Sequence, residues 1–371
     1  MEQLRYWLGF NLVRGIGPVR LRALLDYFGD IQTAWEAPAA ALREVGLDRR
    51  SLSNLLSCRQ QLDLDVVLAR VAEAGAQALT WDSPDYPSLL LQIPDPPPVL
   101  FVRGTLTPAD EWAVALVGTR KATPYGREVA RQLASDLARN NVTVISGLAR
   151  GIDGVAHRAA LDAGGRTIAI LGSGVDHIYP AEHRKLAAEI IENGAVISDY
   201  PLGTRPEASN FPPRNRIISG MSLGVVVVEA GLTSGALITA DFAADQGREV
   251  FAVPGNILRD TSAGANRLLR DGAAIVTEVR DVLETLQLDQ LAEKQVAREL
   301  LPDNPTEAAL LEQLGVEPCH VDELARAAAL PIEQVSSALV MMELKGMVRQ
   351  VGALQYMVAR EPDAPYETET E

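Results

Sequence analysis

The sequence has little cysteine and no long apolar segment. Its 371 residues include only Cys58 and Cys319, too few for a disulfide framework or a structural zinc site. No apolar run approaches the roughly 20 residues that a membrane-spanning helix needs. Residues 1–7 lack the basic-then-apolar order of a signal peptide. We therefore expect a protein of a reducing compartment, the cytoplasm, with no membrane partner.

Several nucleotide and metal motifs are also missing. No G-x-x-x-x-G-K-[ST] occurs, which excludes a P-loop ATPase. The run Gly172-Ser173-Gly174 fails the G-x-G-x-x-G pattern because His177 stands where the third glycine belongs. The four histidines show neither an H-E-x-x-H motif nor a metal-ligand spacing with cysteine. We expect neither a cofactor nor a metal.

Charge is unevenly distributed along the chain. The 34 basic and 49 acidic residues give a net charge of −15, which at first sight argues against a nucleic-acid partner. Residues 110–280, however, hold 18 basic and 19 acidic residues, so the flanks carry the acidity. Of the basic residues, 30 are arginine. Arginine suits bidentate phosphate contacts and stacking on planar groups, although a GC-rich genome would produce the same ratio.

Composition and periodicity divide the chain into six segments, and its length allows two to four domains. Glycines at 15 and 17 followed by Pro18 predict either a helix-hairpin-helix, which presents N–H groups to phosphate, or a plain tight turn between helices. The segments are a helical (helix-hairpin-helix or SAM-like) domain at 1–80, a proline-rich connector at 81–111, a Rossmann-like domain at 112–285, a linker at 286–304, a winged-helix-like domain at 305–360 and a disordered acidic tail at 361–371.

The central segment alternates short apolar runs with helical stretches. These runs are continuous rather than alternating, as expected for strands that are covered on both faces. The order predicts an α/β fold with a doubly wound, mostly parallel sheet. The six expected strands are 113–117, 142–145, 167–171, 195–197, 225–228 and 250–253.

The C-terminal segment predicts three short helices and then a hairpin, the order of a winged helix. Its expected recognition region, residues 320–345, carries Arg326 and Lys345 against four acidic residues. Two basic against four acidic residues make a poor reader of a DNA groove. We therefore expect this module to contact protein, or the rest of the chain, more than duplex DNA.

Glycine and small hydroxyl residues follow several of the expected strands. In an open parallel sheet ligands bind beyond the carboxyl ends of the strands, where glycine admits close backbone approach and helix N-termini attract anions. Several such turns in one sheet, with arginine beside them, predict a row of anion-binding positions. The residues are Gly118, Thr119, Arg120, Ser146, Gly147, Ser234 and Gly235.

A further stretch places an aromatic residue beside two arginines. Phe211 precedes a predicted helix whose first turn contains Arg214, Asn215 and Arg216. Arginine in a first helical turn opposes the helix dipole, which is better tolerated where an anion binds. A stacking face and phosphate neutralisation are what single-stranded nucleic acid needs. A core role for Phe211 and surface ion pairs for the arginines would explain the same pattern.

These motifs resemble those of the DNA-processing protein A family (DprA, also called Smf) of bacterial natural transformation. The matching stretches are 117–120, 146–153, 211–218, 229–230, 234–240 and 253–255. The resemblance implies an extended Rossmann-like domain without enzymatic activity, which protects incoming single-stranded DNA, forms a homodimer and loads the RecA recombinase. By motif position it implies DNA contacts from Arg120, Phe211, Arg214 and Arg216, and phosphate donors at 146–147 and 234–235.

Two other functions remain open on the residues. Glu229 after the strand at 225–228 is also typical of nucleotide phosphoribohydrolases, although their Pro-Gly-Gly approach to a Gly-Thr loop is absent. Release of a base from a nucleoside monophosphate, lost in Glu229→Gln, would favour that enzyme. Recombinase stimulation that survives removal of the central arginines would favour a scaffold whose DNA binding is incidental.

Overall fold

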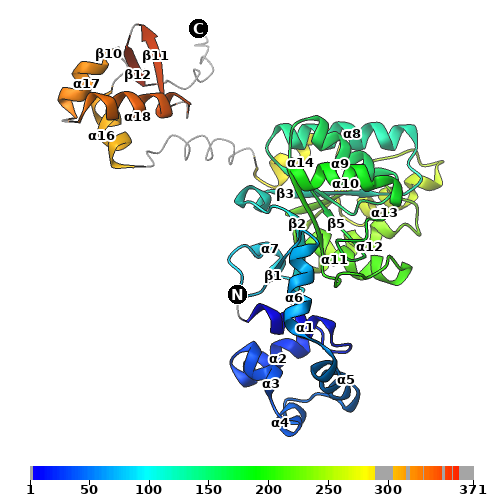
Figure 1. Ribbon diagram of the computed structural model, residues 1–371. Coiled ribbons are helices and arrows are strands. Elements are labelled where there is room, and N and C mark those ends of the chain that lie inside the picture. The colour runs from blue at the N-terminus through cyan, green and yellow to red at the C-terminus, as the bar shows by residue number, and fades with distance from the viewer. Residues whose placement is uncertain are drawn as a thin grey trace. The chain divides into compact units, whose positions relative to one another are not determined.

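The structure, a computed structural model, describes residues 3–288, 304–314, 318–328, 330–344, 347–352 and 354–358. They belong to two compact units, Met1–Leu286 and Gln287–Glu371 (Figure 1). The linker expected at 286–304 lies mostly outside the described residues, and the tail expected at 361–371 lies entirely outside them.

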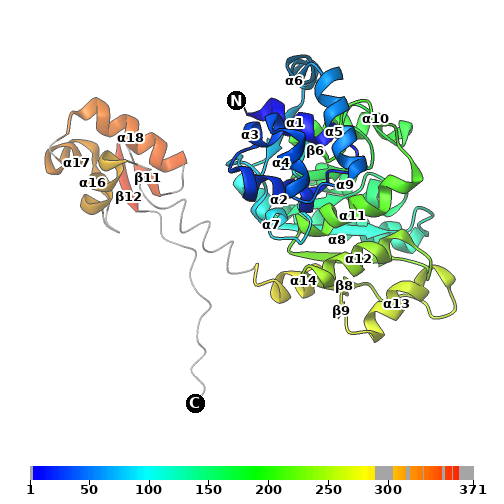
Figure 2. The ribbon, with the colours of Figure 1, turned by 90° about the horizontal axis from the view of Figure 1, so that it is seen from below.

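Six helices open the first unit and are grouped together (Figure 2). Aspartates at 30, 48 and 63 accept hydrogen bonds from the first backbone N–H groups of three of them and so fix where these helices begin. Gly15, at φ 96°, allows the turn between the first two helices, and its carbonyl accepts a hydrogen bond from Arg20. The helices are α1 (Leu4–Leu12), α2 (Pro18–Phe28), α3 (Ile31–Glu36), α4 (Ala39–Glu44), α5 (Arg49–Gln61) and α6 (Leu64–Glu73).

The rest of this unit is built around a nine-stranded sheet, whose strand order is β1-β2-β6-β5-β4-β3-β7-β8-β9. All neighbours pair in parallel except β1 with β2 and β2 with β6, which are antiparallel. The strands are β1 (Gln77–Thr80), β2 (Val99–Gly104), β3 (Ala113–Gly118), β4 (Thr143–Ser146), β5 (Thr167–Ile170), β6 (Gly194–Ser198), β7 (Gly224–Glu229), β8 (Glu249–Ala252) and β9 (Ala274–Ile275). The doubly wound, mostly parallel sheet is confirmed, and each of the six expected strands is present within two residues of its expected ends.

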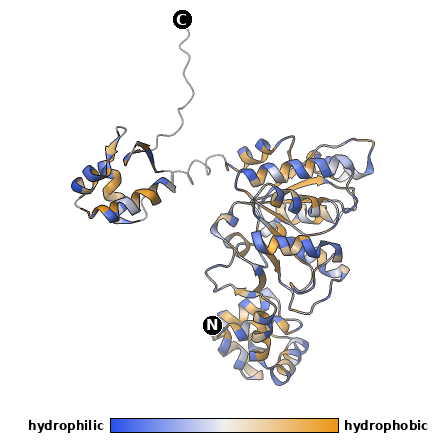
Figure 3. Ribbon diagram, turned by 45° about the horizontal axis from the view of Figure 1, so that its top comes forward, coloured by the Kyte–Doolittle hydropathy of each residue, from blue (hydrophilic) through white to orange (hydrophobic). Residues whose placement is uncertain are grey.

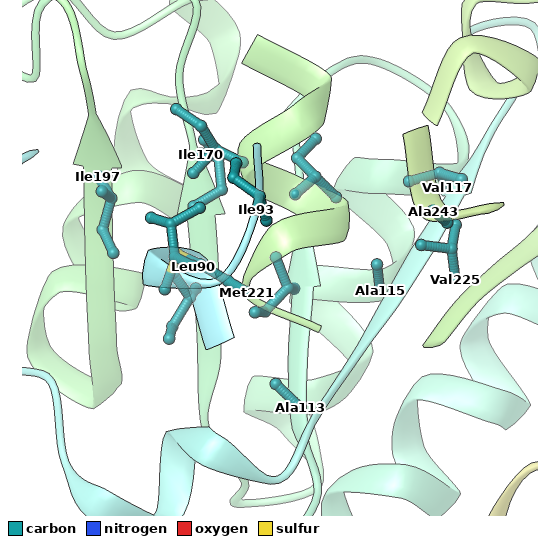
Figure 4. Close-up of a cluster of buried hydrophobic side chains, with 14 of the residues drawn as sticks. Leu90, Ile93, Ala113, Ala115, Val117, Ile170, Ile197, Met221, Val225 and Ala243 are labelled. Atoms are coloured by element: carbon teal, nitrogen blue, oxygen red, sulfur yellow. The ribbon is translucent and has the colours of Figure 1, made fainter. Parts of the chain in front are cut away.

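Alternate residues of the central strands face two helical layers. Ile168 and Ile170 of β5 belong to a cluster with Ile217 of α11, whereas Ala169 between them belongs to a cluster with Ile190 of α10. Figure 4 shows part of the first cluster and Figure 3 the apolar strands at the centre of the unit. The helices are α8 (Pro124–Arg139), α9 (Ile152–Asp162), α10 (Arg184–Asn193), α11 (Phe211–Gly220), α12 (Gly235–Asp245), α13 (Ala263–Arg270) and α14 (Val279–Thr285).

The stretch expected as a connector, 81–111, has a larger role. It contains the short helix α7 (Ser88–Leu91) and strand β2, which joins the sheet. Phe101 of β2 lies in the core of the helical region, and Leu100 beside it lies in the core of the sheet. Residues 1–80 and 112–285 are therefore joined through a shared strand rather than through a free connector.

The second unit has the expected winged-helix order. Helices α16 (Pro305–Gln313), α17 (Val321–Ala327) and α18 (Ile332–Leu344) precede a hairpin of β11 (Val348–Gly352) and β12 (Gln355–Val358). A short strand β10 (Cys319–His320) completes a sheet in the order β10-β12-β11. Leu310, Leu324 and Leu339, one from each helix, lie in its core.

Candidate nucleic-acid interface

A cleft of about 790 Å³ lies beyond the carboxyl ends of the central parallel strands. The order β4-β3-β7 puts the turns after these strands side by side, as expected for an open α/β sheet. The N-terminal ends of α11 and α12 also border it. Of the predicted site residues, it is lined by Gly118, Thr119, Arg120, Phe211, Arg214, Asn215, Ser234 and Gly235.

Phe211 is the aromatic element of the cleft. The Cζ atoms of Arg120 and Arg214 lie 5.4 and 5.7 Å from the centroid of its half-buried ring. Tyr179 lies 5.8 Å away, centroid to centroid. Gly172 makes room for the ring, because a Cβ there would lie 2.9 Å from Phe211 Cδ1. The ring is therefore held in place by its neighbours and still borders open space.

Arg214 lies at the floor of the cleft and is almost fully buried. Its Nη1 donates to the Gly147 carbonyl at 2.9 Å and to the Ile170 carbonyl, which links the turn after β4 to the end of β5. Burial lowers the pKa of Arg214 to about 10, so the group is still charged at neutral pH. Burial also raises the pKa of Asp153, against the opposing effect of Arg214, and Asp153 accepts the N–H groups of Gly147 and Ala149.

Arg216, which the sequence predicts to contact DNA, does not line the cleft. Its side chain is 10% exposed and forms ion pairs with Asp95 and Asp199, each at 3.0 Å. Arg214 and Arg216 are two positions apart on α11, which turns by about 100° per residue. They therefore leave the helix in nearly opposite directions.

Ser146 and Gly147, which the sequence predicts as phosphate donors, donate to groups of the protein itself. The buried Ser146 hydroxyl donates to the Leu116 carbonyl at 2.6 Å, and the Gly147 N–H donates to Asp153 at 3.2 Å. Gly147 is instead required by packing, since a Cβ there would lie 2.5 Å from Nη1 of Arg214. Neither residue has a donor left for a ligand.

The turn after β7, unlike the turn after β4, has an exposed residue that lines the cleft. Ser234 is the N-cap of α12, and its hydroxyl accepts the Ala236 N–H at 3.4 Å. Gly235 is exposed, with open space where a side chain would be. Asn215 of α11 donates to the Gly235 carbonyl at 3.2 Å and so holds the two helix ends together. The Leu237 N–H donates to the Ser234 carbonyl at 3.1 Å, so among the first three N–H groups of α12 only that of Gly235 is left for an anion.

Sequence reasoning missed several residues of the lining. Lys121 is exposed beside Arg120, Thr233 adds a hydroxyl before Ser234, and Tyr179 adds a second aromatic ring next to Phe211. Lys121 could have been predicted from the sequence, because it is one of only four lysines and directly follows the Gly-Thr-Arg turn. Tyr179 could not have been predicted in this way, since it comes nine residues after the end of β5.

Glu229 is the carboxylate that a phosphoribohydrolase would need, and its side chain lies outside the cleft. It is buried, and its Oε2 accepts the Thr123 N–H at 2.9 Å, just before α8 begins. A Cβ at Gly126 in the first turn of α8 would lie 2.3 Å from this oxygen. The Glu229 carboxylate therefore stabilises the positive end of α8, and it does not line the cleft.

Within the described residues, no His, Cys, Asp and Glu side chains are grouped as a metal site would require. The helices described here also include none that is both long and apolar enough to span a bilayer.

Comparison with known proteins identifies the family. A sequence model of DNA recombination-mediator protein A matches residues 77–287, and a model of the DprA winged helix domain matches 292–353. Protein Smf of Synechocystis is 35% identical over 95% of this chain and 98% of its own length. Protein Smf of Escherichia coli is 40% identical over 90% of this chain and 93% of its own length.

Two solved structures share the fold. DNA processing protein A (DprA) from Streptococcus pneumoniae superposes with a TM-score of 0.67 and 34% identity, over 75% of this chain and 95% of that one. DNA processing protein A from Helicobacter pylori, whose structure was described for its single-stranded DNA binding mode, gives 0.52 and 31%, over 58% and 96%. The matched sequence models and the identity along nearly the whole chain show that this protein belongs to the DNA recombination-mediator protein A (DprA/Smf) family.

Proposed function

We propose that this chain is a single-stranded DNA-binding protein of natural transformation, and that the strand lies in the cleft at the ends of β3, β4 and β7. The observation that carries the proposal is the Phe211 ring, which borders the cleft with the Arg120 guanidinium over it at 5.4 Å. A base stacked on this ring would have a cation beside it for its phosphate. The reported single-stranded DNA binding mode of the Helicobacter pylori relative supports the same class of ligand.

Phosphate recognition would come from one exposed pair of cations and one helix end. Arg120 and Lys121 are exposed at the cleft, and the first turn of α12 offers the Gly235 N–H beside Ser234. The start of α11 contributes less to anion binding than its position suggests, because Pro212 and Pro213 have no N–H. The α11 end thus supplies the aromatic ring and the α12 end supplies one phosphate donor.

Binding should show little preference for base sequence. Stacking on an aromatic ring is available to every base, since each has a π-face. Duplex DNA should bind less well, because its bases are already paired and cannot reach Phe211.

The phosphoribohydrolase alternative has less support. Its chemistry needs a carboxylate in the ligand cleft, and Glu229 is buried against the start of α8 instead. We propose that the chain acts without catalysis.

Two finer proposals rest on family membership. The family is described as a recombination mediator, which supports loading of the RecA recombinase onto the bound strand and protection of that strand. Homodimerisation is proposed on the same resemblance.

The direct test is stacking on Phe211. In Phe211→Ala the affinity for a labelled oligothymidine should fall about tenfold or more, because stacking contributes roughly 1–3 kcal/mol per base. Phe211→Tyr should retain most of the affinity. Tyr27→Ala is the matched control, since Tyr27 is an exposed aromatic residue of α2 outside the cleft. Equal affinities of Phe211→Ala and wild type, measured by fluorescence anisotropy, would remove the ring from the site.

A further inference from the structure

Two adjacent large aliphatic residues are almost fully exposed between β8 and α13. Ile257 and Leu258 are each 88% exposed, and we call this pair the aliphatic tip. Single exposed aliphatic residues are common on protein surfaces, but two neighbours at this exposure keep a large apolar area in water. The proposed function gives this pair no role.

The loop that carries the aliphatic tip is internally bonded. At its base the Gly255 N–H donates to Asn266 Oδ1 and the Asn266 Nδ2 donates to the Gly255 carbonyl, both at 3.0 Å. Near its end the Leu258 N–H donates to Asn256 Oδ1 at 2.9 Å and the Arg259 N–H donates to the Asn256 carbonyl at 3.0 Å. These bonds restrain the backbone on both sides of Ile257.

The same loop forms one wall of the cleft. Asp260 and Thr261, which follow the tip after Arg259, line the cleft. Phe211 packs at the other end, against Gly172 after β5. The strand order β5-β4-β3-β7-β8 separates these ends by four strand spacings, about 19 Å. That length would take about six stacked nucleotides at about 3.4 Å each.

A third exposed aliphatic residue lies on the turn after β7, which also borders the cleft. Leu232, 58% exposed, lies between the cleft-lining residues Gly231 and Thr233. The rim near β8 thus carries exposed aliphatic side chains beside Arg259 and Asp260, whereas the floor offers hydroxyls, backbone donors and cations. A single strand has the matching division, with charged phosphates on one side and apolar base faces on the other.

We propose that the aliphatic tip contacts the bases of the single strand where the strand leaves the cleft beside β8. This inference rests on the proposed function, because it needs a strand in the cleft. Aliphatic side chains are known to wedge against base faces, as in the kinking of duplex DNA. Two side chains are far short of the roughly 800 Å² per partner that a stable protein interface buries, which favours bases over a protein as the occupant.

The test is the double variant Ile257→Ser/Leu258→Ser in the full chain. Its affinity for a 20-nucleotide oligothymidine should fall about tenfold, with the slope of log affinity against log salt unchanged, since no phosphate contact is lost. Moving an abasic site along the oligonucleotide should reveal one position that weakens wild type by the same factor and leaves the variant unaffected. Val19→Ser is the matched control, because Val19 is a 75% exposed aliphatic residue of α2 outside the cleft.

The outcomes separate this inference from the proposed function. If Arg120→Ala weakens binding and the double variant binds like wild type, the tip inference is overturned and the proposed function stands. If neither change weakens binding, the proposed function fails and the inference fails with it. A double variant that keeps its DNA affinity but loses its dimer mass or its recombinase stimulation would overturn the inference in favour of a protein contact. An unchanged urea unfolding midpoint, expected for exposed side chains, excludes misfolding as the cause of a loss.

Discussion

Arg214 and Arg216 show how differently one residue type is used over a single helical turn. Arg214 donates to two backbone carbonyls beneath the cleft and has the Phe211 ring 5.7 Å from its Cζ. Arg216 is paired with Asp95 and Asp199 on the other side of α11. Of the three arginines expected to bind DNA, only Arg120 is exposed to an incoming phosphate. Fewer arginines therefore contribute exposed positive charge to the cleft than the sequence suggests. The charge of Lys121 is correspondingly more important for binding a phosphate.

His157 is a residue-scale feature with a measurable consequence for stability. It is fully buried on α9, and its Nδ1 lies 2.7 Å from the Thr167 hydroxyl. Because that hydroxyl donates to the Val144 carbonyl, Nδ1 carries a hydrogen and donates to Thr167. Burial lowers the pKa of His157 to about 3.

We predict that this histidine makes the protein sensitive to mild acid. The unfolded chain takes up a proton on His157 below pH about 6.5, but the folded chain does not do so until the pH is near 3. The free energy of unfolding should therefore fall with decreasing pH in this window, by about 1.4 kcal/mol per pH unit from this residue. Urea unfolding of wild type and His157→Gln between pH 6.5 and 5 measures the effect. The variant should show a shallower dependence, and parallel curves would contradict the assignment.

At the scale of elements, α11 is fixed on both of its sides. Asn215 ties it to the start of α12, and Gln246 at the end of α12 donates to the Arg216 carbonyl. On the far side, Arg216 joins it to Asp199 after β6 and to Asp95 in the proline-rich stretch. Burial raises the pKa of Asp199, and Arg216 opposes that effect by stabilising the charged carboxylate. This ion-pair cluster holds the helix that presents Phe211.

Loss of Arg216 should therefore cost stability. In Arg216→Ala the Asp199 carboxylate, whose side chain is 16% exposed, loses its cation, and breaking such a largely buried pair costs up to about 3 kcal/mol. Urea unfolding at pH 7 should show a midpoint well below that of wild type. Arg139→Ala is the matched control, because the ion pair of Arg139 with Asp136 is exposed and should contribute little. A shift no larger than that of the control would mean that the cluster does not hold α11.

The elements themselves were largely predictable, for a physical reason. A strand covered on both faces is apolar at every position, and the six central runs show this pattern against flanking glycines. Strand β2 was missed because four prolines at 94 and 96–98 precede it and predict a connector, yet β2 lies one residue beyond them at the antiparallel side of the sheet. Strand β9 was missed because it has only two residues.

The candidate site was predictable only in part. Turns after parallel strands share one edge of the sheet, so Gly118–Arg120 and the Ser234 turn could be brought together from sequence. Which side chains are already bonded within the protein depends on tertiary contacts that spacing does not encode. Ser146 is an example, since its partner carbonyl at Leu116 is on another strand. The aliphatic tip gave no sequence signal, because an Ile-Leu pair is most often part of a core.

At the scale of the whole molecule, the charge distribution fits a single DNA strand that is bound in the cleft of the first unit. The chain carries a net charge of −15, but residues 110–280 are near neutral. An acidic surround weakens unspecific attraction to DNA, so affinity must come from local features such as the aromatic ring and the α12 end. The winged helix domain is also acidic in its described helices α17 and α18. They carry one basic residue, Arg326, and four acidic residues, Asp322, Glu323, Glu333 and Glu343. We expect that domain to contact protein rather than a DNA groove.

The measurement that tests the central claim most directly is the salt dependence of single-stranded DNA binding in Arg120→Ala and Arg216→Ala. Each phosphate contact to a single strand contributes about −0.7 to the slope of log affinity against log salt. We predict that Arg120→Ala binds more weakly with a shallower slope, because a phosphate contact is lost. Arg216→Ala should keep the wild-type slope whatever its affinity, because Arg216 only positions α11. An unchanged slope in Arg120→Ala, or a shallower one in Arg216→Ala, would contradict the proposed path of the strand through the cleft.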